Sequence, residues 1–158
     1  MNKKILLVFV VLFVAALSIS SVSALDLGFL SGDDSSNGST TETIFGIDFN
    51  IPDTVTEDED YAINNETTAD SGITFTVEGK TFMDDDDNIM VILVSEYEDL
   101  EVTDEFIAAL GGDEKTINGV DGYINHNDTF YTFSYPKDGK LVVFSTNNDE
   151  KIADFIIA

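Results

Sequence analysis

Residues 129–146, TFYTFSYPKDGKLVVFST, contain two strands and the turn between them, and this hairpin sets the architecture expected for the whole chain. Residues 136–139, PKDG, have the composition of a type I turn closed by a left-handed glycine. Before the turn, Tyr131, Phe133 and Tyr135 alternate with polar residues, which is typical of a strand with one buried side. We expect these rings to share that side and to pack against a helix.

Three further segments have strand patterns: 44–52 (IFGIDFNIP), 73–77 (ITFTV) and 89–94 (IMVILV). The first alternates, places Phe49 on its buried face and ends at Pro52. The last is apolar without interruption, which is typical of a central strand covered on both faces. Turn-forming pairs are expected to separate the strands at Glu78-Gly79, Asn118-Gly119 and Asn127-Asp128.

Two helices complete the expected fold. Thr103 is a typical N-cap, apolar residues follow it at helical spacing, and Gly111-Gly112 ends the segment. The second helix is expected to open at Asn147 or Asn148 and to turn Ile152, Phe155 and Ile156 to the core. The predicted class is α+β: an antiparallel sheet of about six strands with two helices packed on one face.

The N-terminus has the parts of a secretory signal peptide: Lys3 and Lys4, an apolar stretch over 5–17, and small residues in Val22-Ser23-Ala24. We therefore expect a signal peptide over 1–24, a flexible linker over 25–43 and a single domain over 44–158. The alternative is an uncleaved anchor, because 5–25 is just long enough to cross a bilayer of about 30 Å. Serines in its second half favour cleavage. The mature protein is then extracellular or held at the cell surface.

The composition restricts the partners. The chain of 158 residues has 31 acidic and 7 basic residues, and its formal net charge is −24. This charge repels phosphate backbones and anionic lipids, so we expect neither nucleic-acid binding nor peripheral membrane binding by charge. It favours a cationic or cell-envelope partner, or simply solubility. There is no cysteine, so the core has to fold without disulfides, and thiolate chemistry is excluded.

The candidate metal ligands are four consecutive carboxylates, Asp84, Asp85, Asp86 and Asp87. Calcium binds several carboxylate or carbonyl oxygens, and a cation would relieve the repulsion within this run. The alternative, which we favour, is a charged loop at a sheet end that discourages edge pairing. No other cofactor is expected.

Catalytic patterns are weak, and we expect no enzyme. His126 is the one imidazole and stands beside a turn, without a G-x-S-x-G sequence elsewhere. Asp70-Ser71-Gly72 matches the short aspartic-protease signature, but a turn before the next strand explains it. A hydrolase is therefore the least favoured function. Three Asn-x-Ser/Thr acceptors lie in segments expected to be exposed, and they are candidates for glycosylation: Asn37, Asn65 and Asn127.

Three segments carry a resemblance: 45–52 (FGIDFNIP), 117–123 (INGVDGY) and 133–140 (FSYPKDGK). With them the chain resembles small acidic secreted proteins of methanogenic archaea, and its layout is faintly similar to that of PsbP/Mog1-like domains. Neither resemblance implies an activity, because a fold does not give a function. The expected function is a secreted or cell-surface, non-enzymatic binding or accessory domain. The first alternative is a calcium-stabilised surface module.

Overall fold

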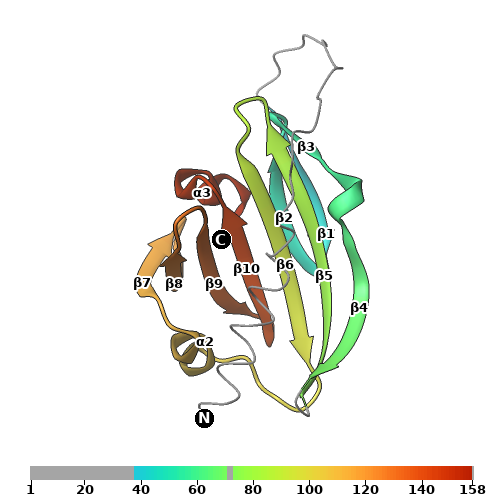
Figure 1. Cartoon of the computed structure of the whole chain (residues 1–158), viewed down its shortest axis with the longest axis vertical. Coiled ribbons are helices and arrows are strands. Elements are labelled where there is room, and N and C mark those ends of the chain that lie inside the picture. Colours follow the sequence, from blue (N-terminus) through green and yellow to red (C-terminus); the bar gives the residue numbers. More distant parts are fainter. Residues whose placement is uncertain (1–37, 71–72, 158) are drawn as a thin grey trace.

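The computed structural model describes residues 38–70 and 73–157, and within them it is mostly β (Figure 1). The described strands are β1 (Ser39–Ile44), β2 (Ile47–Pro52), β3 (Val55–Glu57), β4 (Ile63–Asp70), β5 (Ile73–Asp84), β6 (Ile89–Tyr97), β7 (Asp113–Ile117), β8 (Val120–His126), β9 (Tyr131–Lys137) and β10 (Lys140–Thr146). The helical segments are η1 (Glu59–Tyr61), α2 (Asp104–Leu110), η2 (Asp149–Lys151) and α3 (Ile152–Phe155). The expected signal peptide over 1–24 and Asn37 lie outside the described residues.

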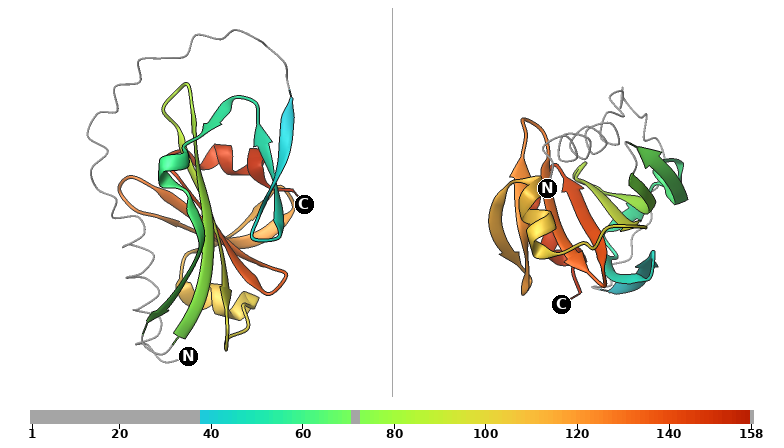
Figure 2. Two further views of the ribbon diagram at one scale, coloured as in Figure 1. Left: turned by 90° about the vertical axis from the view of Figure 1, so that its right-hand side faces the viewer. Right: turned by 90° about the horizontal axis from the view of Figure 1, so that it is seen from below.

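The strands form one large and one small antiparallel sheet. The large sheet has eight strands in the order β3-β5-β6-β10-β9-β8-β7, with β4 also paired to β5. The small sheet is the β1–β2 hairpin, so residues 39–43, at the end of the expected linker, are paired to β2. The large sheet is strongly twisted, and the hairpin lies on one side of it together with α3 (Figure 2).

The expected α+β class with about six strands and two helices on one face is wrong. Three polar segments without an apolar alternation form strands as well: β1, β3 and β4. They lie at the sheet margins, where backbone hydrogen bonds rather than buried side chains hold a strand. The two α-helices are short and pack on opposite faces, since α2 belongs to one apolar cluster and α3 to the other.

The Glu78-Gly79 dipeptide is expected to form a turn, but this expectation is wrong. Gly79 lies inside the continuous strand β5. A Cβ at this position would approach Leu93 Cδ2 on the neighbouring strand to 2.4 Å. The glycine therefore makes room for a large side chain across the ladder, a use that the sequence pattern does not distinguish from a turn.

One face of the large sheet, here called the covered face, is closed by β1, β2 and α3. Phe49 of β2 is fully buried there and meets the Phe144 ring edge-on at 5.7 Å between centroids. The backbone of Phe49 also forms an isolated bridge with Ile156, which follows α3. The burial of Phe49 predicted from the sequence is confirmed. The core on this face comprises Ile44, Ile47, Phe49, Ile51, Phe82, Met90, Ile92, Val94, Ile117, Phe133, Tyr135, Val142, Phe144, Ile152, Phe155 and Ile156.

The opposite face, here called the open face, has a smaller buried cluster beneath α2. Thr103 caps this helix by accepting a hydrogen bond from the Phe106 N–H at 3.2 Å, as the sequence predicts. The buried residues here are Leu93, Tyr97, Val102, Phe106, Ile107, Leu141 and Val143. Because β6 contributes buried residues to both clusters, its prediction as a central strand covered on both faces is also confirmed.

Three hairpins of the fold close with two-residue turns whose residues have positive φ: Phe45-Gly46, Asn118-Gly119 and Asp138-Gly139. This is the type I′ geometry, which matches the right-handed twist of the strands. The type I turn expected over 136–139 is therefore wrong, because Lys137 and Lys140 pair directly across the turn. In the described part of the chain, no helix has the length and apolar character needed to cross a bilayer.

Candidate functional site

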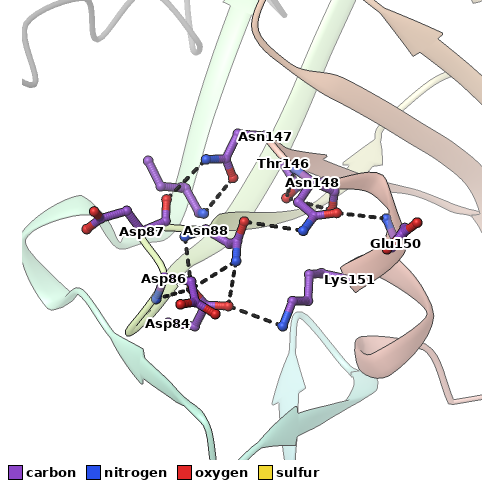
Figure 3. A network of polar contacts seen from close by, with 10 residues as sticks. Asp84, Asp86, Asp87, Asn88, Thr146, Asn147, Asn148, Glu150 and Lys151 are labelled. Atoms are coloured by element: carbon purple, nitrogen blue, oxygen red, sulfur yellow. Dashed lines mark hydrogen bonds and ion pairs between the residues drawn. The ribbon is translucent and has the colours of Figure 1, made fainter.

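The acidic run ends β5 with Asp84 and continues into the loop before β6, and a second segment, residues 146–151, packs beside this loop (Figure 3). The sheet brings the two together. Because β10 pairs with β6, Thr146 lies opposite Met90, and the chain that follows β10 passes directly over the loop. Residues more than 50 positions apart in sequence thus form one polar network.

Asp84 is the centre of this network, and its side chain is only 7 % exposed. Its Oδ1 accepts hydrogen bonds from the backbone N–H of Asp86 at 3.0 Å and of Asn88 at 2.9 Å. The Asn88 amide donates to Oδ2 at 2.8 Å, and Lys151 Nζ lies 3.3 Å from the same oxygen. Asp84 therefore holds its own loop closed and ties it to the C-terminal segment.

The environment keeps Asp84 ionised. Burial raises the pKa of its carboxyl, but the hydrogen bonds from Asn88, from Lys151 and from the Asp86 N–H outweigh burial. The pKa therefore lies below its ordinary value. The charged form is the one that the folded protein stabilises.

Asparagine side chains complete the connection between the two segments. Asn147 accepts from the Ile89 N–H at 2.8 Å and donates to the Asp87 carbonyl at 3.0 Å. Asn148 donates to Asn88 Oδ1 at 3.3 Å. Sequence reasoning marked Asn147 and Asn148 only as helix caps and did not predict these partners, because pairing across 58 to 60 positions depends on the strand order.

The four candidate metal ligands do not act as one group. Asp84 points inward, whereas Asp85, Asp86 and Asp87 are exposed. Across 38–70 and 73–157, no group of three or more His, Cys, Asp or Glu residues is arranged to hold a metal ion. The Lys151 ammonium already supplies a positive charge beside Asp84, so an ion would have to compete with it. Calcium binding at this loop stays a prediction.

A cavity beside the network has a volume of about 10 Å³, which is room for about one water molecule. Its lining includes Phe82, Asp84, Thr146, Lys151 and Phe155. It is too small for an organic ligand.

The two residues considered for catalysis lie far apart in the sheet order. His126 ends β8, is exposed, and stacks on Tyr131 with 4.1 Å between ring centroids. Asp70 ends β4, and β5, β6, β10 and β9 come between the two strands. The structure does not bring these residues into one site, and the absence of enzymatic activity stays a prediction.

Two glycosylation candidates lie in the described residues. Asn65 is exposed and has φ of 52° at an irregular point of the β4–β5 ladder. Asn127 is exposed too, but its Oδ1 accepts from the N–H groups of Thr129 at 3.0 Å and Phe130 at 2.8 Å. The side chain of Asn127 therefore already has a structural role in its turn.

The lysines of the described chain all contact the covered side. Lys80 pairs with Glu42 of β1 and Glu57 of β3; burial lowers its pKa, but these two carboxylates raise it more. The other contacts are Lys115 with Asp149 at 2.9 Å, Lys140 with Glu96 at 3.8 Å and over the Phe45 ring, Lys151 with Asp84, and Lys137 with the Ile157 carbonyl at 3.2 Å.

In the described ranges, the carboxylates of the open face have no lysine paired with them. Burial raises the pKa of the Tyr123 hydroxyl, and the nearby negative charges of Glu114, Asp104 and Glu105 raise that pKa further. Sequence reasoning missed this separation, because it depends on which side of each strand a residue faces.

Comparisons with protein-family models, with curated protein sequences and with solved structures found no match. The two resemblances drawn from sequence segments therefore stay predictions.

Proposed function

We propose that the chain is an exported, non-enzymatic binding domain that acts outside the cell or at its surface. Export is supported by the N-terminal pattern of Lys3, Lys4, the apolar residues 5–17 and the small residues before Leu25. The localisation follows from that pattern alone, since these residues lie outside the described part of the structure.

Binding is supported above all by the separation of charge between the two faces. Every lysine in the described ranges already has a partner on the covered side. Among residues 38–70 and 73–157, the carboxylates of the open face therefore have no lysine partner. Such a surface attracts and orients positively charged partners, with an association rate that falls as salt is added.

Export is tested by producing the full chain with a C-terminal tag in an exporting host. We expect the tagged protein outside the cytoplasm, with an intact mass that starts at Leu25. Leu12→Arg should keep it inside by interrupting the apolar stretch, whereas Leu12→Ile should not. Recovery of Met1 in the membrane fraction would support the anchor, and cytoplasmic wild-type protein would contradict export.

The alternative function is a calcium-stabilised module that uses Asp84, Asp85, Asp86 and Asp87. It is favoured only by the three exposed carboxylates next to an ionised Asp84. At 100 times its Kd, calcium would add about 2.7 kcal/mol to the free energy of unfolding. Replacing Asp85 and Asp87 with Asn should abolish that gain. An equal gain from magnesium or simple salt would identify screening instead.

A further inference from the structure

Part of the open face has apolar side chains that no described element covers completely. Helix α2 packs over the β8 and β9 side of this face. On the β4, β5 and β6 side the apolar side chains remain half-buried. We call this set the apolar strip; it comprises Ile63, Ile73, Phe75, Val77 and Val91.

Three residues of the strip form one row on β5. Phe75 lies opposite Tyr97, and its ring is 5.5 Å from that of Tyr97 between centroids. Val77 is the next residue on the same side of β5, and Ile73 precedes Phe75. Side chains two apart on one strand point to the same face, so the three form one row.

Exposed carboxylate residues lie beside this row at Glu66 and at its end, where the Glu98 N–H donates to the Thr74 carbonyl. Glu66 of β4 lies opposite Val77, and Glu98, Asp99 and Glu101 follow β6 in the segment that leads to α2. All four are exposed. None of the five lysines in the described ranges lies on this face, since each contacts the covered side. The border is therefore acidic without compensation.

We propose that the apolar strip and its acidic border bind a cationic amphipathic segment of a partner protein. The apolar side chains of that segment cover Phe75 and Val77, and its lysines or arginines meet Glu66, Glu98 and Glu101. This inference rests on the proposed binding function and adds the face and the chemistry of the partner. Apolar contact supplies affinity, and charge selects the partner and speeds the encounter.

Charge complementarity selects this occupant over a second copy of the chain. A copy would present either the same acidic border or lysines that are already paired. Like charges facing each other across an interface oppose association.

The experiment measures binding of a labelled 18-residue helical Leu/Lys peptide to residues 25–158 by fluorescence anisotropy. Glu66→Gln/Glu98→Gln/Glu101→Gln should weaken binding about tenfold, or about 1.4 kcal/mol. The matched control, Asp138→Asn/Glu150→Gln/Asp154→Asn, removes the same charge from exposed sites near the covered side and should change Kd less than twofold. Val77→Ser should also weaken binding, and a Ser/Lys peptide of equal charge should bind at least tenfold more weakly. Circular dichroism verifies the fold of each variant.

Equal weakening by the two triple variants would overturn the proposal, because the attraction would then follow net charge alone. Equal binding of the Ser/Lys and Leu/Lys peptides would do the same by removing the apolar contribution. If the protein sediments as a dimer, and Val77→Ser weakens that dimer, the strip is the interface with a second copy. Binding by residues 25–158 but not by the full chain would assign it to the N-terminal segment. Failure of export leaves these peptide results unchanged, so the two proposals fail separately.

Discussion

The two faces of the eight-stranded sheet are built from similar strands but have different tasks. On the covered face, a hairpin and a short helix close a core of fully buried aromatic rings, and all described lysines tie the layers together. On the open face, one seven-residue helix covers part of the sheet, and a half-buried apolar row remains beside exposed carboxylates. The described lysines of this acidic chain thus lie where the large sheet meets the hairpin and the C-terminal segment. Stability and binding are expected to depend on different faces.

The largest expected effect is on the covered face. Phe49→Ala should lower the free energy of unfolding by about 3–5 kcal/mol, because it removes a fully buried ring and leaves a cavity. Phe75→Ala on the open face should cost about 1–2 kcal/mol, since that ring is only half-buried. Asp48→Ala, exposed next to Phe49, should change stability by about 0.5 kcal/mol or less. Urea unfolding measures all three, and equal losses at Phe49 and Phe75 would remove the distinction between the faces.

The next effect concerns the charge network that holds the acidic loop. Asp84→Asn should cost about 1–3 kcal/mol at pH 7, because the N–H groups of Asp86 and Asn88 and the ammonium of Lys151 lose their charged acceptor. Asp85→Asn, in the same loop but exposed, should change little.

The pH dependence of this loss follows from the lowered pKa of Asp84 in the folded state. A carboxyl with a lowered folded-state pKa contributes stability above its unfolded value of about 3.9, and loses it as pH falls through the folded value. The difference between wild type and Asp84→Asn should therefore be constant above about pH 5 and shrink toward lower pH. Chemical unfolding between pH 2 and pH 7 measures it. A difference that grows on acidification would contradict the assigned ion pair.

The smallest effect has the opposite sign and lies on the open face. Among the described residues, Ser145 Oγ is a fully buried side-chain oxygen without a hydrogen-bond partner. Ser145→Ala should raise the free energy of unfolding by about 0.5–1 kcal/mol, because it removes a hydroxyl that loses its water on folding without gaining a hydrogen bond. Ser134 lies on the same face of β9, the strand next to β10, and is also buried. Ser134→Ala is therefore the control for removing a buried serine hydroxyl. A loss of stability in Ser145→Ala alone would mean that the hydroxyl has a partner.

The pattern of apolar side chains predicted strands that contribute to the core. The apolar run in 89–94 corresponds to β6, and Thr103 caps α2 as expected. The single strand expected over 44–52 is only partly correct, because Phe45-Gly46 forms the turn between β1 and β2 and the alternation lies in β2 from Ile47 onward. The polar strands β1, β3 and β4 were missed, because an edge strand is held by its backbone hydrogen bonds and needs no apolar alternation. The number of strands and the fold class were therefore wrong even though most of the core was correct.

The candidate site was less accessible from the sequence than the core. The sequence does not distinguish the four consecutive aspartates. In the structure, the Asp84 side chain is buried and hydrogen-bonded, whereas the next three are exposed. The partner of Asp84, Lys151, lies 67 positions later and approaches only because β10 pairs with β6. The separation of lysines from the open face likewise appears only when each strand's two sides are known.

The difference between the faces is tested most directly by NMR titration of residues 25–158 with the Leu/Lys peptide. If the open face binds it, amide shifts should concentrate in β4, β5 and β6 around Phe75, Val77 and Val91, and leave β1, β2 and α3 unchanged. Shifts centred on β1, β2 and α3, or spread evenly over both faces, would contradict the assignment of binding to the open face.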